Sequence, residues 1–272
     1  RITSAATLRG GRFQGFTMLT GMRSLTFLFA ALVMAPPASA QSSLGLAGIE
    51  ATMGLTASSG TSFATGRLSG DFRITEAHGF QLDLSARDYP GGYLGQIDGH
   101  LYLAPTTRSK YGLFASLADV SGREATIAYA GAEGIFALGS DTILQARAGI
   151  GYARPGAFDF VAADAQLAHA LSDTIAVHVG AQIAEVQEQA LDTRPWAAEL
   201  GLDWHIADGP LFLSAALGAT GLAGPDSAPS DTYLRLGLTW RFGGAGGARR
   251  PISARPFTAP APFDPLFRRG LF

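Results

Sequence analysis

Residues 196–206 read Trp-Ala-Ala-Glu-Leu-Gly-Leu-Asp-Trp-His-Ile, with an apolar side chain at every second position. Successive side chains of a β-strand point to opposite faces, so this stretch gives a strand one apolar and one more polar face. The same alternation occurs in residues 80–87, 175–183 and 234–242. A period of two that recurs along the chain indicates an all-β fold.

Turn residues divide the chain at regular intervals. Near-copies of one turn occur at residues 139–143 and 171–175, and short turns alternate with longer connections such as 187–195 and 221–230. The pattern predicts about twelve strands, with ten and fourteen left open. Their expected ranges are 44–56, 63–74, 80–87, 93–103, 111–119, 124–137, 142–153, 158–169, 174–186, 196–206, 211–220 and 232–242.

The faces of these strands are typical of a membrane barrel rather than a soluble sandwich. Only 15% of the residues are charged, against roughly 25% in an ordinary soluble domain. The apolar face is nearly free of charge, the other face is rich in Ala, Gly, Ser and Thr, and aromatic residues lie near strand ends. We therefore expect a closed, antiparallel, up-and-down transmembrane β-barrel, with both ends of the barrel sequence in the periplasm.

The polar face then lines the lumen. The barrel region 41–242 holds 11 basic and 21 acidic residues, which favours cations if these charges face a channel. Charges of both signs equally allow a lumen closed by pairing and by side-chain filling, and we leave both possibilities open. The lumen-lining candidates are Arg67, Asp71, Arg73, Asp83, Arg87, Asp98, His100, Arg147, His178, Glu199, Asp203, His205, Arg235 and Arg241.

An export signal precedes the barrel sequence. Met22 and Arg23 are followed by an apolar run, 25–35, and by small residues up to Ala40. This is the three-part pattern of a secretory signal peptide, and it predicts cleavage before Gln41. Residues 1–21 show no patterning, and we expect them to be a non-native or upstream extension.

The last predicted strand ends in Arg-Leu-Gly-Leu-Thr-Trp-Arg-Phe, residues 235–242. This stretch resembles the C-terminal assembly signal of Gram-negative outer-membrane β-barrel proteins, with Gly237, Trp240 and Phe242 at the characteristic positions. In pattern, residues 41–242 are similar to small porin-like barrels. The resemblance implies export by the general secretion route, insertion by the barrel-assembly machinery and residence among outer-membrane lipids.

Thirty residues follow that signal, whereas the family usually ends at its aromatic residue. Residues 243–272 are rich in Gly, Pro and Arg and contain five Arg and one Asp. They show neither a strand nor a helix period, so we expect a disordered tail. Its positive charge would also let it enter the lumen, contact peptidoglycan or bind a periplasmic partner.

The sequence predicts a small porin-like channel for passive passage of solutes or ions. One alternative is a closed structural or adhesion barrel whose loops 187–195 and 221–230 contact partners. The other is a hydrolase that uses the pairs Asp98/His100 or Asp203/His205, which we weight lowest because i and i+2 neighbours share any strand face. We expect no enzyme, cofactor, metal site or nucleic-acid partner, since cysteine is absent, the five histidines are scattered and the net charge is −2. The oligomeric state stays open.

Overall fold

The computed structural model describes residues 45–58, 61–121, 125–154, 158–188, 191–206, 209–243 and 247–271. The expected upstream extension 1–21, the signal peptide 22–40 and the cleavage before Gln41 lie outside the described residues.

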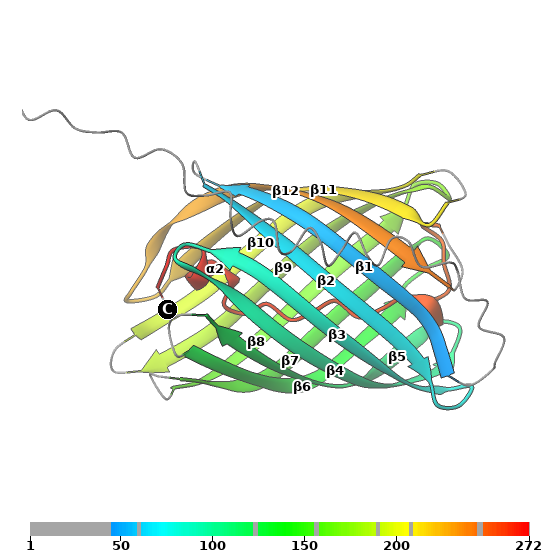
Figure 1. The fold of residues 1–272 in the computed structure, drawn as a ribbon, viewed down its shortest axis with the longest axis horizontal. Helices are drawn as coiled ribbons and strands as arrows, with labels where there is room; N and C mark the ends of the chain where they lie inside the picture. Colours follow the sequence, from blue (N-terminus) through cyan, green and yellow to red (C-terminus); the bar gives the residue numbers. More distant parts are fainter. Residues whose placement is uncertain are drawn as a thin grey trace, which may run out of the picture. The chain divides into compact units, whose positions relative to one another are not determined.

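Twelve antiparallel strands form one closed up-and-down barrel, which confirms the predicted fold class and strand number (Figure 1). Each strand has 12 to 15 residues, enough for a tilted membrane crossing, which needs about 9–11. The strands are β1 (Gly45–Ser58), β2 (Thr61–Arg73), β3 (His78–Tyr89), β4 (Gly92–Thr106), β5 (Ser109–Val120), β6 (Ala125–Ala137), β7 (Thr142–Arg154), β8 (Phe158–Ala170), β9 (Ile175–Glu188), β10 (Leu191–His205), β11 (Leu211–Ala223) and β12 (Ala228–Phe242).

The first and last strands close the ring. β1 pairs with β12 in unbroken register, from Ile49 opposite Phe242 to Ser58 opposite Tyr233. Both strands therefore have a hydrogen-bonded neighbour on each side, and the barrel has no free edge. We call the end where β1 begins and β12 finishes the entry end, and the opposite end, where β1 turns into β2, the far end.

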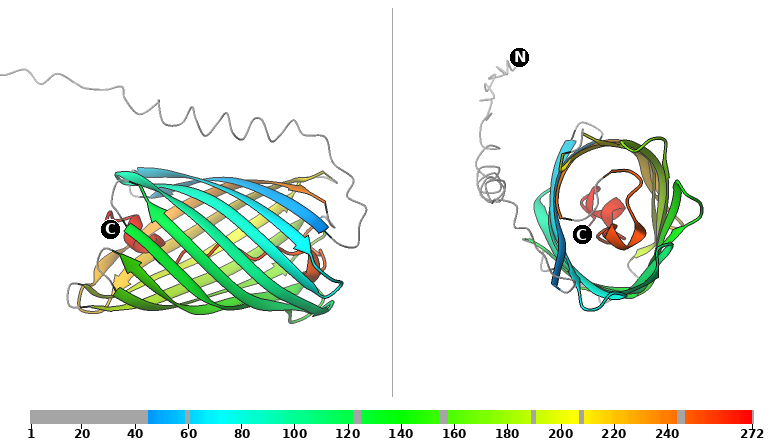
Figure 2. Two further views of the ribbon diagram at one scale, coloured as in Figure 1. Left: turned by 60° about the horizontal axis from the view of Figure 1, so that its bottom comes forward. Right: turned by 90° about the vertical axis from the view of Figure 1, so that its right-hand side faces the viewer.

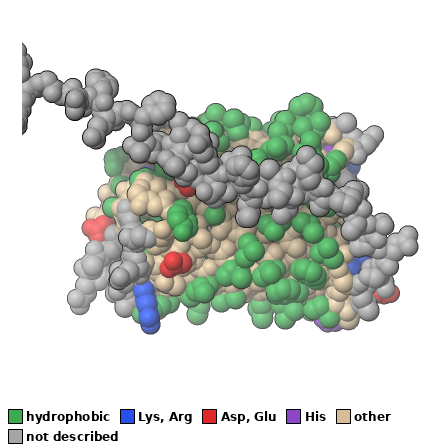
Figure 3. All heavy atoms as spheres, viewed as in Figure 1, with side chains coloured by type: hydrophobic (Ala, Val, Ile, Leu, Met, Phe, Trp, Pro, Cys, Tyr) green, Lys and Arg blue, Asp and Glu red, His purple; other side chains and the backbone are tan. Residues whose placement is uncertain are grey.

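The outer face of the barrel is apolar. Leu113 and Leu200 are each 64% exposed and Ile150 is 70% exposed, although all three are mid-strand residues. In Figure 3 hydrophobic side chains are spread over the visible wall, and the few visible charges lie mainly toward its ends. The apolar residues thus face outward, and no second sheet covers them in the described part of the chain.

Two predicted loops are wrong. β9 continues to Glu188, β10 begins at Leu191, and β11 and β12 reach Ala223 and Ala228, so most of residues 187–195 and 221–230 is strand. Pro195 suggests the end of a strand because proline has no N–H to donate. In the structure Pro195 still lies opposite Leu222 of β11. On the β9 side, Pro195 has no paired residue. The remaining β11–β12 turn uses Gly224 at φ 103°, a conformation that favours glycine.

Most of the described residues after β12 lie inside the barrel. Residues 247–271, which we call the lumen segment, run from the entry end to the far end (Figure 2). The segment contains a short 3-10 helix, η1 (Ile252–Ala254), and one helical turn, α2 (Asp264–Phe267). This differs from the disordered tail that its composition predicts, because wall side chains supply the hydrogen bonds and apolar contacts that the segment cannot make with itself. No helix in the described part of the chain is long and apolar enough to cross a bilayer.

We expect an arginine on the outer face to destabilise the barrel in lipid. Leu200→Arg places a charge near the middle of β10 and should lower the free energy of unfolding by about 2–4 kcal/mol. The matched change Gln166→Arg, on the lumen side of β8, should cost much less. Urea titration in lipid vesicles, followed by the gel shift between folded and heat-unfolded protein, measures both. Equal losses at the two positions would contradict a lipid-facing outer surface.

Candidate functional site: the lumen and its C-terminal segment

The lumen segment is held at the entry end by two short turns of the barrel. The Ala248 N–H donates to the Asp173 carbonyl over 2.8 Å. The Arg249 guanidinium donates to the carboxylates of Asp141 at 2.6 Å and Asp173 at 2.8 Å. A hydrogen bond from Ser140, together with Arg249, holds the pKa of Asp141 below its usual value. This ion pair therefore persists into the mildly acidic range.

Inside the barrel, wall side chains bind the main chain of the segment. Gln81 makes a two-way contact with Phe257, donating to its carbonyl over 2.9 Å and accepting from its N–H over 2.8 Å. Three more wall residues donate to main-chain carbonyls. They are Lys110 to Arg255 at 2.9 Å, Gln96 to Pro260 at 2.9 Å and Gln182 to Ala261 at 3.1 Å.

Phe257 is the aromatic anchor in the half of the lumen nearer the entry end. Its side chain is fully buried and stacks on the His100 ring, with 5.5 Å between centroids. Tyr102 meets it edge-on, and the Lys110 ammonium lies 4.8 Å from the ring centroid. A buried aromatic ring between a cation and a second aromatic gains both apolar burial and cation–π attraction.

A second apolar anchor lies toward the far end. Phe263, Leu266 and Phe267 are buried in a cluster with inward aromatic and aliphatic residues of β4, β5, β6, β8, β9 and β11. The Phe263 ring lies 4.4 Å from the Phe160 ring, centroid to centroid. Between the anchors, Thr258 Oγ1 accepts hydrogen bonds from Gln145 and Arg147, each at 2.9 Å.

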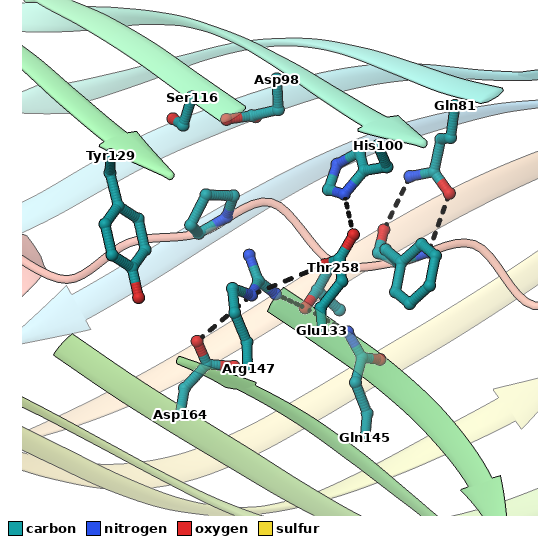
Figure 4. A network of polar contacts seen from close by, with 12 residues as sticks. Gln81, Asp98, His100, Ser116, Tyr129, Glu133, Gln145, Arg147, Asp164 and Thr258 are labelled. Carbon is teal, nitrogen blue, oxygen red and sulfur yellow. Dashed lines mark hydrogen bonds and ion pairs between the residues drawn. The ribbon is translucent and has the colours of Figure 1, made fainter. Parts of the chain in front are cut away.

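A cluster of buried charges lies beneath the segment. His100 Nδ1 faces Glu133 at 2.5 Å and its Nε2 faces Asp83 at 3.2 Å, while Arg67 binds both Asp83 and the Phe257 carbonyl. Figure 4 shows Glu133 between His100 and Arg147, close to Thr258. Arg147 lies 3.4 Å from Asp164 and 3.8 Å from Glu133. Such a network is stable only because most of its members are paired.

The other sequence-predicted residues occupy the remaining wall. Asp71 accepts from Tyr102, Arg73 lies in a small cavity at the entry end, and Arg87 lies 3.7 Å from Asp264 of the segment. Asp98 is buried and accepts from Gln96. The other half of the wall carries the ion pairs Arg235–Glu199, at 3.0 Å, and Arg241–Glu50, together with His178, Asp203 and His205.

The Asp–His pairs expected from i and i+2 spacing do not form. His100 pairs with Asp83 and Glu133 rather than Asp98, and Asp203 pairs with His178 at 3.1 Å rather than with His205. His205 Nε2 instead faces the Gly209 carbonyl at 2.7 Å. Cross-strand neighbours, rather than neighbours along one strand, decide these contacts. His100 is also fully buried beneath Phe257, with a carboxylate on each ring nitrogen.

Residue counts predicted a net-acidic lumen wall, whereas the structure shows inward charges that are largely paired. The inner-wall pairs are Arg67–Asp83, Arg147–Asp164, Arg235–Glu199, Arg241–Glu50 and Lys110–Asp71. Many acidic residues, Asp141 and Asp173 among them, lie on turns or at the rims of the barrel rather than on the inner wall. A count of charged residues cannot separate these positions from lumen-facing ones.

Sequence reasoning missed the residues that hold the segment. These are the inward glutamines Gln81, Gln96, Gln145 and Gln182, the single lysine Lys110, and the segment residues Phe257 and Thr258. One signal was present: Phe114, Tyr129 and Phe160 are aromatic residues at inward positions. Large apolar rings on a lumen face indicate a lumen that is packed rather than filled with water.

An open space remains on the other side of the segment. A cavity of about 340 Å³ lies between the segment and the wall, lined mostly by small and polar residues of β1–β3 and β7–β12 and by segment residues that include Thr258. It has room for on the order of ten water molecules. A smaller cavity of about 50 Å³ lies nearer the entry end. Thr52 lines the first cavity and Glu50 the second, so the two are consecutive along β1. We call them together the side passage.

The described residues contain no group of three His, Asp or Glu side chains arranged to hold a metal ion.

No family model matches the sequence, and no curated protein matches it. Solved structures do match the fold. The NanC porin superposes with a TM-score of 0.53 at 9% identity, over 71% of this chain and 98% of the porin. An outer-membrane channel from Pseudomonas putida F1 superposes with a TM-score of 0.52 at 13% identity, over 76% of this chain and 100% of that one. The chain therefore has the closed β-barrel fold of bacterial outer-membrane porins.

Proposed function

We propose that this chain resides in the bacterial outer membrane and acts as a small porin-like channel for ions and small solutes. The observation that carries the proposal is the side passage, two cavities that follow one another along β1 inside a barrel whose outer wall is apolar. The two solved structures that share the fold are named a porin and an outer-membrane channel, which supports the same function.

The biogenesis partners follow from this placement. We propose export by the signal peptide, insertion by the barrel-assembly machinery through the signal at Gly237, Trp240 and Phe242, and contact with outer-membrane lipids. Trp240 and Phe242 stack at 5.6 Å between ring centroids at the entry end of β12. We propose a non-enzymatic role, because the histidines of the inner wall face carboxylates and a carbonyl in arrangements that serve packing.

The closed structural barrel is the second candidate, favoured by the lumen segment that fills much of the interior. An adhesion role is expected to use loops 187–195 and 221–230. It has less support, because most of these residues belong to strands.

Planar-bilayer recording distinguishes the channel from the closed barrel. We expect purified, folded protein to give discrete conductance steps that are small for a twelve-stranded barrel, because only the side passage conducts. Protein that shows the folded gel shift but gives no steps over many insertions would contradict the channel and leave the structural role.

Charge substitutions in the side passage should change its ion selectivity in opposite directions. Arg235 and Glu199 both line the passage and pair at 3.0 Å. Arg235→Gln removes a positive charge and should shift the reversal potential toward cation preference, whereas Glu199→Gln should shift it toward anions. Reversal potentials under a salt gradient measure both changes.

The control is Arg194→Gln, which breaks a comparable 3.0 Å pair with Glu185 on the outer rim. Its reversal potential should stay at the wild-type value. A shift as large as that of Arg235→Gln would show that ions do not pass Arg235.

A further inference from the structure

Over residues 255–261, most hydrogen bonds from the wall go to the main chain of the lumen segment rather than to its side chains. Gln81, Lys110, Gln96 and Gln182 all bond backbone groups of residues 255–261. Every residue of a polypeptide carries the same carbonyl group, so such contacts recognise an extended chain with little regard to its sequence. Selectivity comes from the seats of Phe257 and of Phe263, which each take an aromatic side chain.

We propose that the inner wall from β3 to β9 is a binding track for an extended polypeptide with aromatic anchors, occupied in this chain by its own lumen segment, and that displacing the segment opens a wider pore. The track adds a means of control to the proposed channel. The proposal that displacement opens a wider pore rests on that channel function. The segment is the gate, and a peptide of the same chemistry is the ligand that the emptied track would take.

The barrel does not need the segment to remain closed. The sheet is completed by β1 and β12, and each strand of the ring bonds its two neighbours. Among the described residues, the backbone–backbone hydrogen bond between the segment and the barrel runs from the Ala248 N–H to the Asp173 carbonyl, at the entry turn. Within the lumen, side chains hold the segment, so its release breaks no sheet pairing.

The walls of the track are able to bind water once the segment leaves. Polar atoms of Arg67, Glu133 and Arg147 are already buried without a hydrogen-bond partner in the described part of the chain. Water that enters an emptied track would satisfy these atoms together with the freed glutamine amides, which lowers the cost of displacement.

The segment also sets the charge of the lumen. It carries five arginines and one aspartate, and Arg250 and Arg268 lie inside the barrel beside Glu50 and Asp264. Arg249 pairs with Asp141 and Asp173, and Arg250 lies near Glu50, so removal of the segment takes positive charge away from these carboxylates. Its departure must therefore move the pore toward cation preference, whatever the starting selectivity.

Cutting the tether tests the proposal in a barrel that has folded with its whole chain. A recognition site for a sequence-specific protease is inserted into the Gly-rich spacer, residues 243–247. The substitution Leu271→Cys supplies a thiol for a fluorescent dye, and this thiol is unique because the chain has no cysteine. A short covalent tether gives the segment that it holds an effective concentration on the order of 1 mM at its binding site. Cleavage followed by dilution removes that advantage.

We expect the uncut protein to conduct like the wild type. After cleavage, gel filtration should show dye leaving the barrel, conductance should rise severalfold, and the reversal potential should shift toward cations. A synthetic peptide of residues 247–272 should restore the small conductance and bind the emptied barrel in a fluorescence anisotropy titration. The same peptide with serine replacing Phe257, Phe263 and Phe267 should bind at least tenfold more weakly.

Each other outcome overturns a stated part. Dye that stays with the barrel after extensive dilution contradicts a displaceable segment, and equal binding of the two peptides contradicts the aromatic seats. Release with no change in conductance contradicts the gate. If the peptide binds a barrel that conducts neither before nor after cleavage, the binding track is supported and the channel function is contradicted. Failure of the track and failure of the channel are therefore distinguishable.

A single substitution tests the anchor in the intact chain. Phe257→Ala should give frequent transitions to a larger conductance, because the segment loses its fully buried ring. The matched control is Phe136→Ala, which truncates a phenylalanine of β6 that is 37% exposed, next to the buried, inward Ile135. Single-channel records of the two variants should differ, with Phe136→Ala like the wild type. Identical records would contradict a gating role for Phe257.

Discussion

The pairing of β1 with β12 is the constraint on which the rest of the structure depends. A β-strand in a bilayer has no water to bind its backbone groups, so every N–H and carbonyl must find a partner in the sheet. The register from Ile49–Phe242 to Ser58–Tyr233 meets that demand at the seam. Once the ring is closed, the alternation of the strands sorts side chains into two populations, with Leu113 and Leu200 outside and Asp83 and His100 inside.

Closure creates a lumen, and the lumen must then be filled with protein or water. Near β3 to β9 it is filled by protein, where aromatic seats and glutamine amides accept the lumen segment. Near β1 and β10–β12 it is left open, where Gly54, Ala198 and Gly237 present little bulk. This asymmetry accounts for both features of the interior. The lumen segment lies against the wall from β3 to β9, and a cavity with a mostly small and polar lining remains beside the segment.

The lumen segment adds one more passage of the chain through the barrel after the twelve strands. Twelve strands return β12 to the entry end, and the lumen segment then crosses the interior once more, so residues 264–271 lie at the far end. If the entry end faces the periplasm, as the sequence analysis expects for an outer-membrane barrel, residues 264–271 would face the outside of the cell. A molecule outside the cell that competes for the aromatic seats would thus meet the end of the segment directly.

Sequence reasoning reached the fold and many of the inward charges, because both depend on a local period of two. Residues 196–206 alternate whether or not the rest of the chain is known, and this places Glu199 and Asp203 on one face and Leu200 on the other. It failed at the rims, where Pro195 and Gly221 suggest loops but cross-strand hydrogen bonding carries the strands past them. It also failed for the histidine partners, since His100 meets Asp83 and Glu133 across strands.

The sequence by itself determined that the chain forms a barrel of about twelve strands with an apolar exterior, because alternation and turn spacing are written along the chain. Only the tertiary structure decided what occupies the interior. Residues 247–271 have no periodicity, so their conformation depends on Gln81, Phe160 and Gln182, which come together only when the sheet has closed around them. The order of the lumen segment is therefore a property of the closed ring, and no stretch of its own sequence encodes it.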